Sequence, residues 1–166
     1  YTHILCVLDI FSRFLWTRRL TSAKTEEVTD AFISILNYSE RKPQELTFDR
    51  GPEFNSSEFT DMLLYEDILH RVAENKNEIA TLDRAISTLK VLITRRTISE
   101  GGGNWAMELA KATRSYNFTP HEHLDTVPAK VEGNDSVRFS LQQQATKDVD
   151  IQDKVTRKSM AKPGVG

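Results

Sequence analysis

The pattern of apolar and polar positions in the first part of the chain predicts two neighbouring strands. Residues 3–10 are nearly all apolar and rich in branched side chains, which is typical of a strand buried on both faces. Ser12-Arg13 predicts a tight turn, so residues 14–20 should form an antiparallel neighbour. A short third strand is expected near residues 21–24.

Helical spacing of apolar side chains follows this strand pair. Thr25 can cap a helix whose apolar face extends to Leu36. Residues 46–49 predict the next strand, which we expect to run parallel to the first because a helix crosses over between them. Residues 55–58 resemble a capping box that begins a further helix, and residues 68–72 predict a fifth strand.

The second half of the chain is predominantly helical in its pattern. Residues 78–97 carry apolar side chains in steps of three and four, and residues 105–117 form a second amphipathic stretch. Residues 137–141 suit a strand. The expected fold is α/β, with a five-stranded mixed sheet and flanking helices in residues 1–132 and a partly disordered extension or linker in residues 133–166.

Composition narrows the class of protein. The chain has 166 residues, 39% hydrophobic and 28% charged, which suits one soluble domain with a full core. No apolar run is long enough to cross a bilayer, so no membrane partner is expected. The single cysteine, Cys6, excludes an internal disulfide and a cysteine-based zinc cluster. Because the chain opens at Tyr1 inside a strand-like run, we expect a domain or fragment of a longer protein.

Three acids are candidates for a metal site. Asp9 ends the first predicted strand, Asp49 ends the strand at 46–49, and Asp83 comes from the first turns of the long helix. If the two strands are parallel neighbours, Asp9 and Asp49 lie at one edge of the sheet, where their repulsion favours a bound cation. Three such acids suit Mg²⁺ or Mn²⁺, and a pair of these ions suits phosphoryl transfer.

Each acid also has a simpler interpretation. An Asp at a strand end usually forms a turn or caps a helix, and Asp83 alone is typical of a solvated acid in a first helical turn. Asp9 is the more unusual residue because it interrupts an apolar strand. His121 and His123 lie close together, but no further histidine or cysteine near them in sequence supports a metal site. The basic segment at 154–158 is typical of a solvated tail, with phosphate contact as the alternative.

Four segments together resemble the catalytic core of retroviral and retrotransposon integrases, and lean toward the integrases of Polinton or Maverick elements. The resemblance covers about residues 1–132. The segments are Val7-Leu8-Asp9-Ile10-Phe11-Ser12-Arg13 with Trp16, Thr47-Phe48-Asp49-Arg50-Gly51-Pro52-Glu53-Phe54, Leu82-Asp83-Arg84-Ala85-Ile86-Ser87-Thr88-Leu89-Lys90, and Tyr116-Asn117-Phe118-Thr119-Pro120-His121.

The resemblance implies an RNase H-like fold and a DDE-type recombinase that binds two divalent metal ions. Such an enzyme cuts DNA ends with water and joins the freed 3′-hydroxyl to target DNA. By position, Asp9, Asp49 and Asp83 would be the catalytic and metal-binding triad, and Lys90 would contact DNA phosphate. The remaining candidates for DNA contact are Arg50 and Asn75. The family further implies DNA as partner, a homo-oligomer and a nuclear location.

The third acid departs from the family pattern. The family has Glu where this chain has Asp83, and the 33 residues between Asp49 and Asp83 are two fewer than in the integrase pattern. Strict spacing falls on Ala85, which cannot bind a metal, and the nearest glutamate is Glu78. Two alternatives to an integrase therefore stay open: an inactive, domesticated core that binds DNA or a partner, and a nuclease that only hydrolyses.

Overall fold

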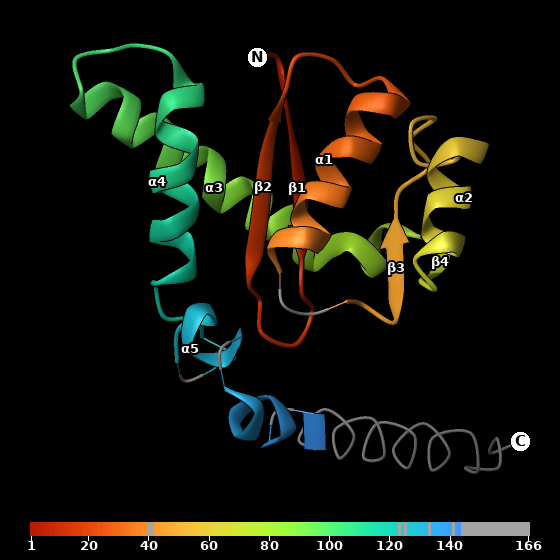
Figure 1. Ribbon diagram of the computed structural model, residues 1–166. Coiled ribbons are helices and arrows are strands. Elements are labelled where there is room, and N and C mark those ends of the chain that lie inside the picture. Colours follow the sequence, from red (N-terminus) through yellow and green to blue (C-terminus); the bar gives the residue numbers. More distant parts are fainter. Residues whose placement is uncertain (40–41, 123, 125, 133, 141, 144–166) are drawn as a thin grey trace, which may run out of the picture.

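The computed structural model describes residues 1–39, 42–122, 124, 126–132, 134–140 and 142–143 (Figure 1). The labelled elements of this part of the chain are four strands, a 3₁₀ helix and five α-helices, and residues 135–140 are also helical. In order, they are β1 (His3–Leu8), β2 (Leu15–Leu20), α1 (Thr25–Tyr38), β3 (Glu45–Phe48), α2 (Ser57–Tyr65), β4 (Leu69–Val72), η1 (Lys76–Ile79), α3 (Ala80–Ser99), α4 (Trp105–Asn117) and α5 (Pro128–Glu132).

Strands β1 and β2 form an antiparallel hairpin with a continuous register from His3↔Leu20 to Leu8↔Leu15. The hairpin is closed by the Asp9 N–H, which donates to the Phe14 carbonyl at 3.0 Å. Arg13 adopts a positive φ of 58° in this turn. The prediction of two antiparallel strands joined by a tight turn is confirmed.

The hairpin is buried on both faces because its side chains alternate. On one face Leu5 and Leu20 pack with α1 and α2, and on the other Leu15 packs with α3 and α4. Figure 1 shows α1 in front of the hairpin and α3 passing behind it. The nearly continuous apolar sequence of β1 follows from this arrangement, since both of its faces contribute to an apolar cluster.

The edge of β2 is closed by a side chain from α4. The Asn117 amide accepts a hydrogen bond from the Leu15 N–H and donates one to the Leu15 carbonyl, both at 2.9 Å. Asn117 is itself buried. One side chain thus satisfies two backbone groups that β1 does not reach, and it fixes the last turn of α4 against the hairpin.

Strands β3 and β4 form a separate parallel pair, with Glu45↔Leu69 to Phe48↔Val72 in register. Helix α2 connects them, and Phe48 packs against Phe54 and Phe59 at ring-centroid distances of 5.6 and 5.8 Å. Ser56 caps α2 by accepting from the Phe59 N–H at 3.3 Å, one residue later than the box at 55–58 predicts.

The prediction of one five-stranded mixed sheet is wrong for the described residues, which contain four strands in two sheets of two. No strand forms at residues 21–24, where Thr21 and Ser22 instead donate backbone and side-chain hydrogen bonds to the Glu27 carboxylate. Residues 137–140 are helical rather than extended, and Leu141 lies outside the described residues.

The prediction that the strand before Asp49 lies parallel to the first strand is also wrong. In the described chain β1 pairs with β2 and β3 pairs with β4, and no pairing joins β1 to β3. Figure 1 shows the chain descending from its N-terminus through β1 to the turn, whereas the arrow of β3 points upward. The ends of β1 and β3 therefore point in roughly opposite directions.

Helices α3 and α4 are joined by a glycine turn and an ion-pair network. Gly101 and Gly102 have φ values of 82° and 86°, a region that L side chains rarely adopt. Glu108, which is buried, binds Arg96 at 3.0 Å and Lys111 at 3.2 Å. The Arg96–Glu108 pair links α3 to α4, and Lys111 binds the same carboxylate from within α4.

We expect Glu27→Gln to lower the melting temperature at neutral pH. Hydrogen bonds from the Thr21 backbone and the Ser22 side chain lower the pKa of Glu27 from 4.5 to about 2, despite some desolvation. A depressed folded-state pKa gives stability that is complete above the unfolded pKa and is lost as the pH falls. The difference from wild type should shrink between about pH 4.5 and 2. Glu26→Gln is the matched control, and an equal effect of both variants at every pH would contradict a stabilising role of the bonds from Thr21 and Ser22 to Glu27.

Replacing Asn117 by Ala should destabilise the protein by about 2–4 kcal/mol, because the buried Leu15 N–H and carbonyl lose their partner. Denaturant unfolding measures this change. Asn104→Ala, which removes the exposed N-cap of α4, is the control and should cost about 1 kcal/mol.

Candidate active site

Asp49 lies immediately after β3, where the strand leaves the core. The preceding residue Phe48 is buried, whereas Asp49 is exposed. Its carboxylate accepts a hydrogen bond from the Gly51 N–H at 3.1 Å, which forms the turn that Gly51 and Pro52 predict. The strand therefore presents a carboxylate at its carboxyl end, as expected.

A shallow, open pocket of about 190 Å³ adjoins this carboxylate. It lies at the carboxyl ends of the parallel strands β3 and β4, which is where ligands bind in open α/β sheets. Acidic and basic side chains meet there in about equal number. The lining residues are Asp49, Arg50, Ala73, Glu74, Asn75, Lys76 and Ile79.

The predicted candidates Arg50 and Asn75 both lie in this pocket, together with Glu74 and Lys76, which the sequence reasoning missed. A signal was present, because residues 73–76 directly follow the strand predicted at 68–72, although the pattern alone does not show that this strand pairs with the one that ends at Asp49. Parallel neighbours deliver their carboxyl ends to one edge, so the residues after both strands should meet.

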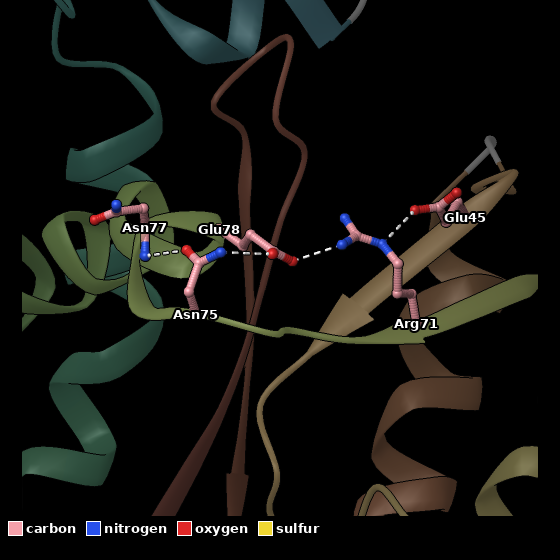
Figure 2. A network of polar contacts seen from close by, with 5 residues as sticks. All are labelled: Glu45, Arg71, Asn75, Asn77 and Glu78. Atoms are coloured by element: carbon pink, nitrogen blue, oxygen red, sulfur yellow. Dashed lines mark hydrogen bonds and ion pairs between the residues drawn. The ribbon is translucent and has the colours of Figure 1, made fainter.

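A polar network adjoins the pocket at Asn75, and Figure 2 shows it from close by. Arg71 lies between Glu45, at 3.4 Å, and Glu78, at 2.5 Å. The Asn75 amide donates to Glu78 at 3.0 Å and accepts from the Asn77 N–H at 3.0 Å. Hydrogen bonds to Glu45 and then to Glu78 raise the pKa of Arg71. The network joins β3, β4 and η1.

This network bears on two predicted residues. Glu78, the alternative third acid, accepts hydrogen bonds from Arg71 and Asn75, so its charge is balanced by Arg71. Asn75 uses both its amide oxygen and its amide nitrogen to cap η1 and hold Glu78. In this arrangement both residues organise the loop that follows β4.

Asp83 and Lys90 are exposed on α3, with Asp83 in its first turn. Asp83 follows the pocket-lining Ile79 by four residues, and this spacing places consecutive residues on one face of a helix. Lys90 lies two turns further along. Asp83 itself does not line the pocket.

Asp9 has a different environment at the hairpin turn. Its carboxylate accepts from the Ser12 hydroxyl at 2.6 Å and from the Arg138 guanidinium at 2.6 Å. Burial alone would raise the pKa of Asp9, but the hydrogen bonds from Ser12 and Arg138 outweigh it and the pKa is lowered. Arg138, which the sequence reasoning did not single out, thus ties the segment after α5 to the hairpin turn.

The structure does not bring the three acids together. Among the residues that it describes, no three His, Cys, Asp or Glu side chains are grouped so as to hold one metal ion. Asp9 ends a strand that points away from the end of β3, so the expectation that it shares an edge with Asp49 is wrong. Carboxylates are the right donors for Mg²⁺ or Mn²⁺, but their placement here does not fit a site built from this triad.

Comparisons with known proteins agree on the class of fold. Residues 1–78 match the family model of the integrase core domain. A transposon-derived protein of Caenorhabditis elegans, itself uncharacterized, is 24% identical over 134 residues, which are 81% of this chain and 47% of that protein. The chain thus spans about half the length of this curated relative.

Solved structures show the same fold at low sequence identity. A chain of the simian T-cell lymphotropic virus intasome, in complex with PP2A regulatory subunit B56 gamma, superposes with a TM-score of 0.73 at 16% identity, over 79% of this chain and 48% of that chain. The HTLV-2 integrase catalytic core domain, in complex with magnesium, has a TM-score of 0.66 at 18% identity, over 75% and 80%. The chain therefore has the α/β fold of the retroviral integrase catalytic core, which is RNase H-like.

The helices of the described part of the chain are too short or too polar to span a membrane.

Asp9→Asn should lower the free energy of unfolding by about 1–2 kcal/mol, because the charge-assisted bonds from Ser12 and Arg138 weaken. Asp83→Asn removes an exposed acid by the same chemical change, and its effect should stay within about 0.5 kcal/mol. Denaturant unfolding of the two variants compares a structural acid with a solvated one. Equal stabilities would show that the hairpin turn does not depend on the charge of Asp9.

Proposed function

We propose that this chain is the catalytic core of a DDE-type integrase, a polynucleotidyl transferase that cuts DNA ends and joins them to target DNA. The observation that carries the proposal is the exposed Asp49 at the carboxyl end of β3, beside a pocket that also holds Arg50 and Lys76. The match of residues 1–78 to the integrase core domain and the fold of the solved integrase cores support the same class.

Within this proposal Asp49 and Asp83 act as carboxylates toward divalent metal ions, Mg²⁺ or Mn²⁺, which would supply charge stabilisation for phosphoryl transfer. Asp9 is the remaining member of the predicted triad, but its carboxylate is bound by Ser12 and Arg138 at the hairpin turn, which gives that role no support. Arg50 and Lys90 would contact DNA phosphates, since guanidinium and ammonium groups bind the backbone without reading sequence.

The proposed partners are DNA and further copies of the chain. The HTLV-2 integrase core is described in both dimeric and trimeric forms, and the simian virus protein assembles as an intasome. We also propose that the chain forms a homo-oligomer, acts in the nucleus and descends from a Polinton-type element.

A second candidate is an inactive core that binds DNA or a partner without catalysis. The observation that favours it is the placement of the acids, because the described residues group no three ligands and the third acid is the shorter Asp83. The two candidates make different predictions for the intact protein.

In the intact protein, Asp49→Asn should reduce the joining of a pre-cut DNA end to a target duplex by about 100-fold or more, since one charged ligand is lost at the reacting centre. Calorimetry with Mn²⁺ should show weaker binding in the same variant. Asp61→Asn, which changes an exposed acid of α2, is the matched control and should leave both unchanged. Mn²⁺ binding that is indifferent to Asp49→Asn would favour the inactive core, and cutting without joining would favour a nuclease.

A further inference from the structure

Lys76 is an exposed cation that lines the pocket beside Asp49. The second basic side chain of the pocket is Arg50, and the two carboxylates are those of Asp49 and Glu74. Within the part of the chain that the structure describes, neither Lys76 nor Arg50 forms an ion pair with an acid. The two positive charges of the pocket are therefore available to a ligand.

The turn that carries Lys76 is closed by hydrogen bonds that span this residue. The Asn75 side-chain oxygen accepts from the Asn77 N–H at 3.0 Å, and the Asn75 carbonyl accepts from the Glu78 N–H at 3.3 Å. Asparagine commonly forms such a turn by bonding the backbone two residues on. The position of the Lys76 backbone thus depends on where Asn75 is held.

Charged side chains attach this turn to the sheet, as Figure 2 shows. Arg71 of β4 donates to the Glu78 carboxylate at 2.5 Å, and the Asn75 amide donates to the same carboxylate at 3.0 Å. Arg71 also contacts Glu45 of β3 at 3.4 Å. We call the bonds that join Arg71, Glu78 and Asn75 the loop clasp.

The loop clasp relates Lys76 to the strand that presents Asp49. Strands β3 and β4 pair in register, and Asp49 directly follows the last residue of β3. The side chains of Arg71 and Glu78 are 49% and 21% exposed, and ion pairs near the surface contribute little to the stability of a fold. What the clasp can do is restrict the positions of the loop that follows β4.

A phosphodiester accompanied by a divalent cation matches both signs of charge in this pocket. Mg²⁺ is usually bound by one or two carboxylates together with phosphate oxygens of a substrate. Lysine binds phosphate as a point charge at the end of a flexible stem. Holding the backbone of a flexible residue in place lowers the entropy that is lost when it binds. A clasped loop therefore favours phosphate binding by Lys76.

We propose that the loop clasp positions Lys76 at the pocket and that Lys76 binds a backbone phosphate of DNA there. Arg71 and Glu78 are positioning residues, because they act through the turn that carries Lys76. This inference deepens the proposed function and rests on its DNA partner, not on its chemistry. It also gives Glu78 a role other than that of a metal ligand.

The salt dependence of DNA binding by the intact protein tests the phosphate contact. The affinity for a short duplex is measured in EDTA at a series of KCl concentrations, so that loss of a bound metal ion cannot change the result. Lys76→Gln should weaken binding and make the slope of log K against log[KCl] shallower by about 0.9, the value for one phosphate contact. Lys24→Gln, which changes an exposed lysine before α1, is the matched control and should leave the slope unchanged.

The sign of the Glu78→Gln effect separates positioning from simple charge. Removing an acid near DNA reduces repulsion, so charge alone predicts tighter binding, which we expect for the pocket residue Glu74 in Glu74→Gln. The loop clasp predicts the opposite for Glu78→Gln: weaker binding with the same loss of slope as Lys76→Gln, although Lys76 is intact. In the Lys76→Gln background, Glu78→Gln should cause no further weakening.

Residue-resolved hydrogen exchange follows the loop clasp without DNA. The Asn77 amide should exchange several-fold faster in Glu78→Gln, because the Asn75 side chain that it bonds loses its anchor. The Leu69 amide, which bonds the Gln44 carbonyl, is the internal control. The melting temperature should stay close to that of the wild type, which shows that the variant is folded.

Three results would overturn the proposal. The salt slope is the same with and without Lys76, which includes a protein that does not bind DNA; or Glu78→Gln binds DNA as tightly as the wild type or more tightly; or Asn77 exchanges equally fast in both. None of these results depends on DNA joining. A changed slope without joining activity would retain Lys76 as a phosphate ligand and reject the integrase, whereas joining with an unchanged slope would reject only this inference.

Discussion

The hydrogen-bonding requirement of buried strand edges is the constraint on which this fold depends. A strand buried on both faces must pair its backbone on both edges, because no water reaches it. The hairpin meets this requirement on its outer side through the Asn117 amide, which satisfies Leu15 from α4. On its inner side the edge of β1 faces β3 without pairing. The same requirement thus explains the position of the last turn of α4.

Much of the fold could be predicted from local pattern. The apolar runs of β1 and β3, the capping residues of α2 and the amphipathic periods of α1, α3 and α4 all lie where their sequences place them. These features depend on neighbours within a few residues. Sheet order depends on contacts between distant segments, which local pattern does not show. The strand predicted at residues 21–24 from local pattern alone does not form. Their polar groups, Thr21 and Ser22, are bound by Glu27 rather than by a strand.

The missing strand at residues 21–24 also explains why the acids were misplaced. A helix that crosses over joins parallel strands, and α1 connects β2 to β3. Since β1 is antiparallel to β2, β1 and β3 must point in opposite directions. One additional strand before α1 would have reversed this relation and brought Asp9 to the edge of Asp49. A single wrong element therefore moved one predicted ligand from one end of the sheet to the other.

Asp9 and Asp49 show how the surroundings of an acid indicate its role. The Asp9 carboxylate accepts hydrogen bonds from the Ser12 hydroxyl, the Arg138 guanidinium and the backbone of its own turn. The protein therefore already satisfies its charge. The Asp49 carboxylate accepts a hydrogen bond from the Gly51 N–H and otherwise faces an open pocket that Arg50 and Lys76 also line. A carboxylate whose charge is satisfied would lose those bonds on binding a cation, whereas an exposed one gains by binding. Sequence motifs treat both residues alike, and only the packing around them separates the structural acid from the candidate catalytic one.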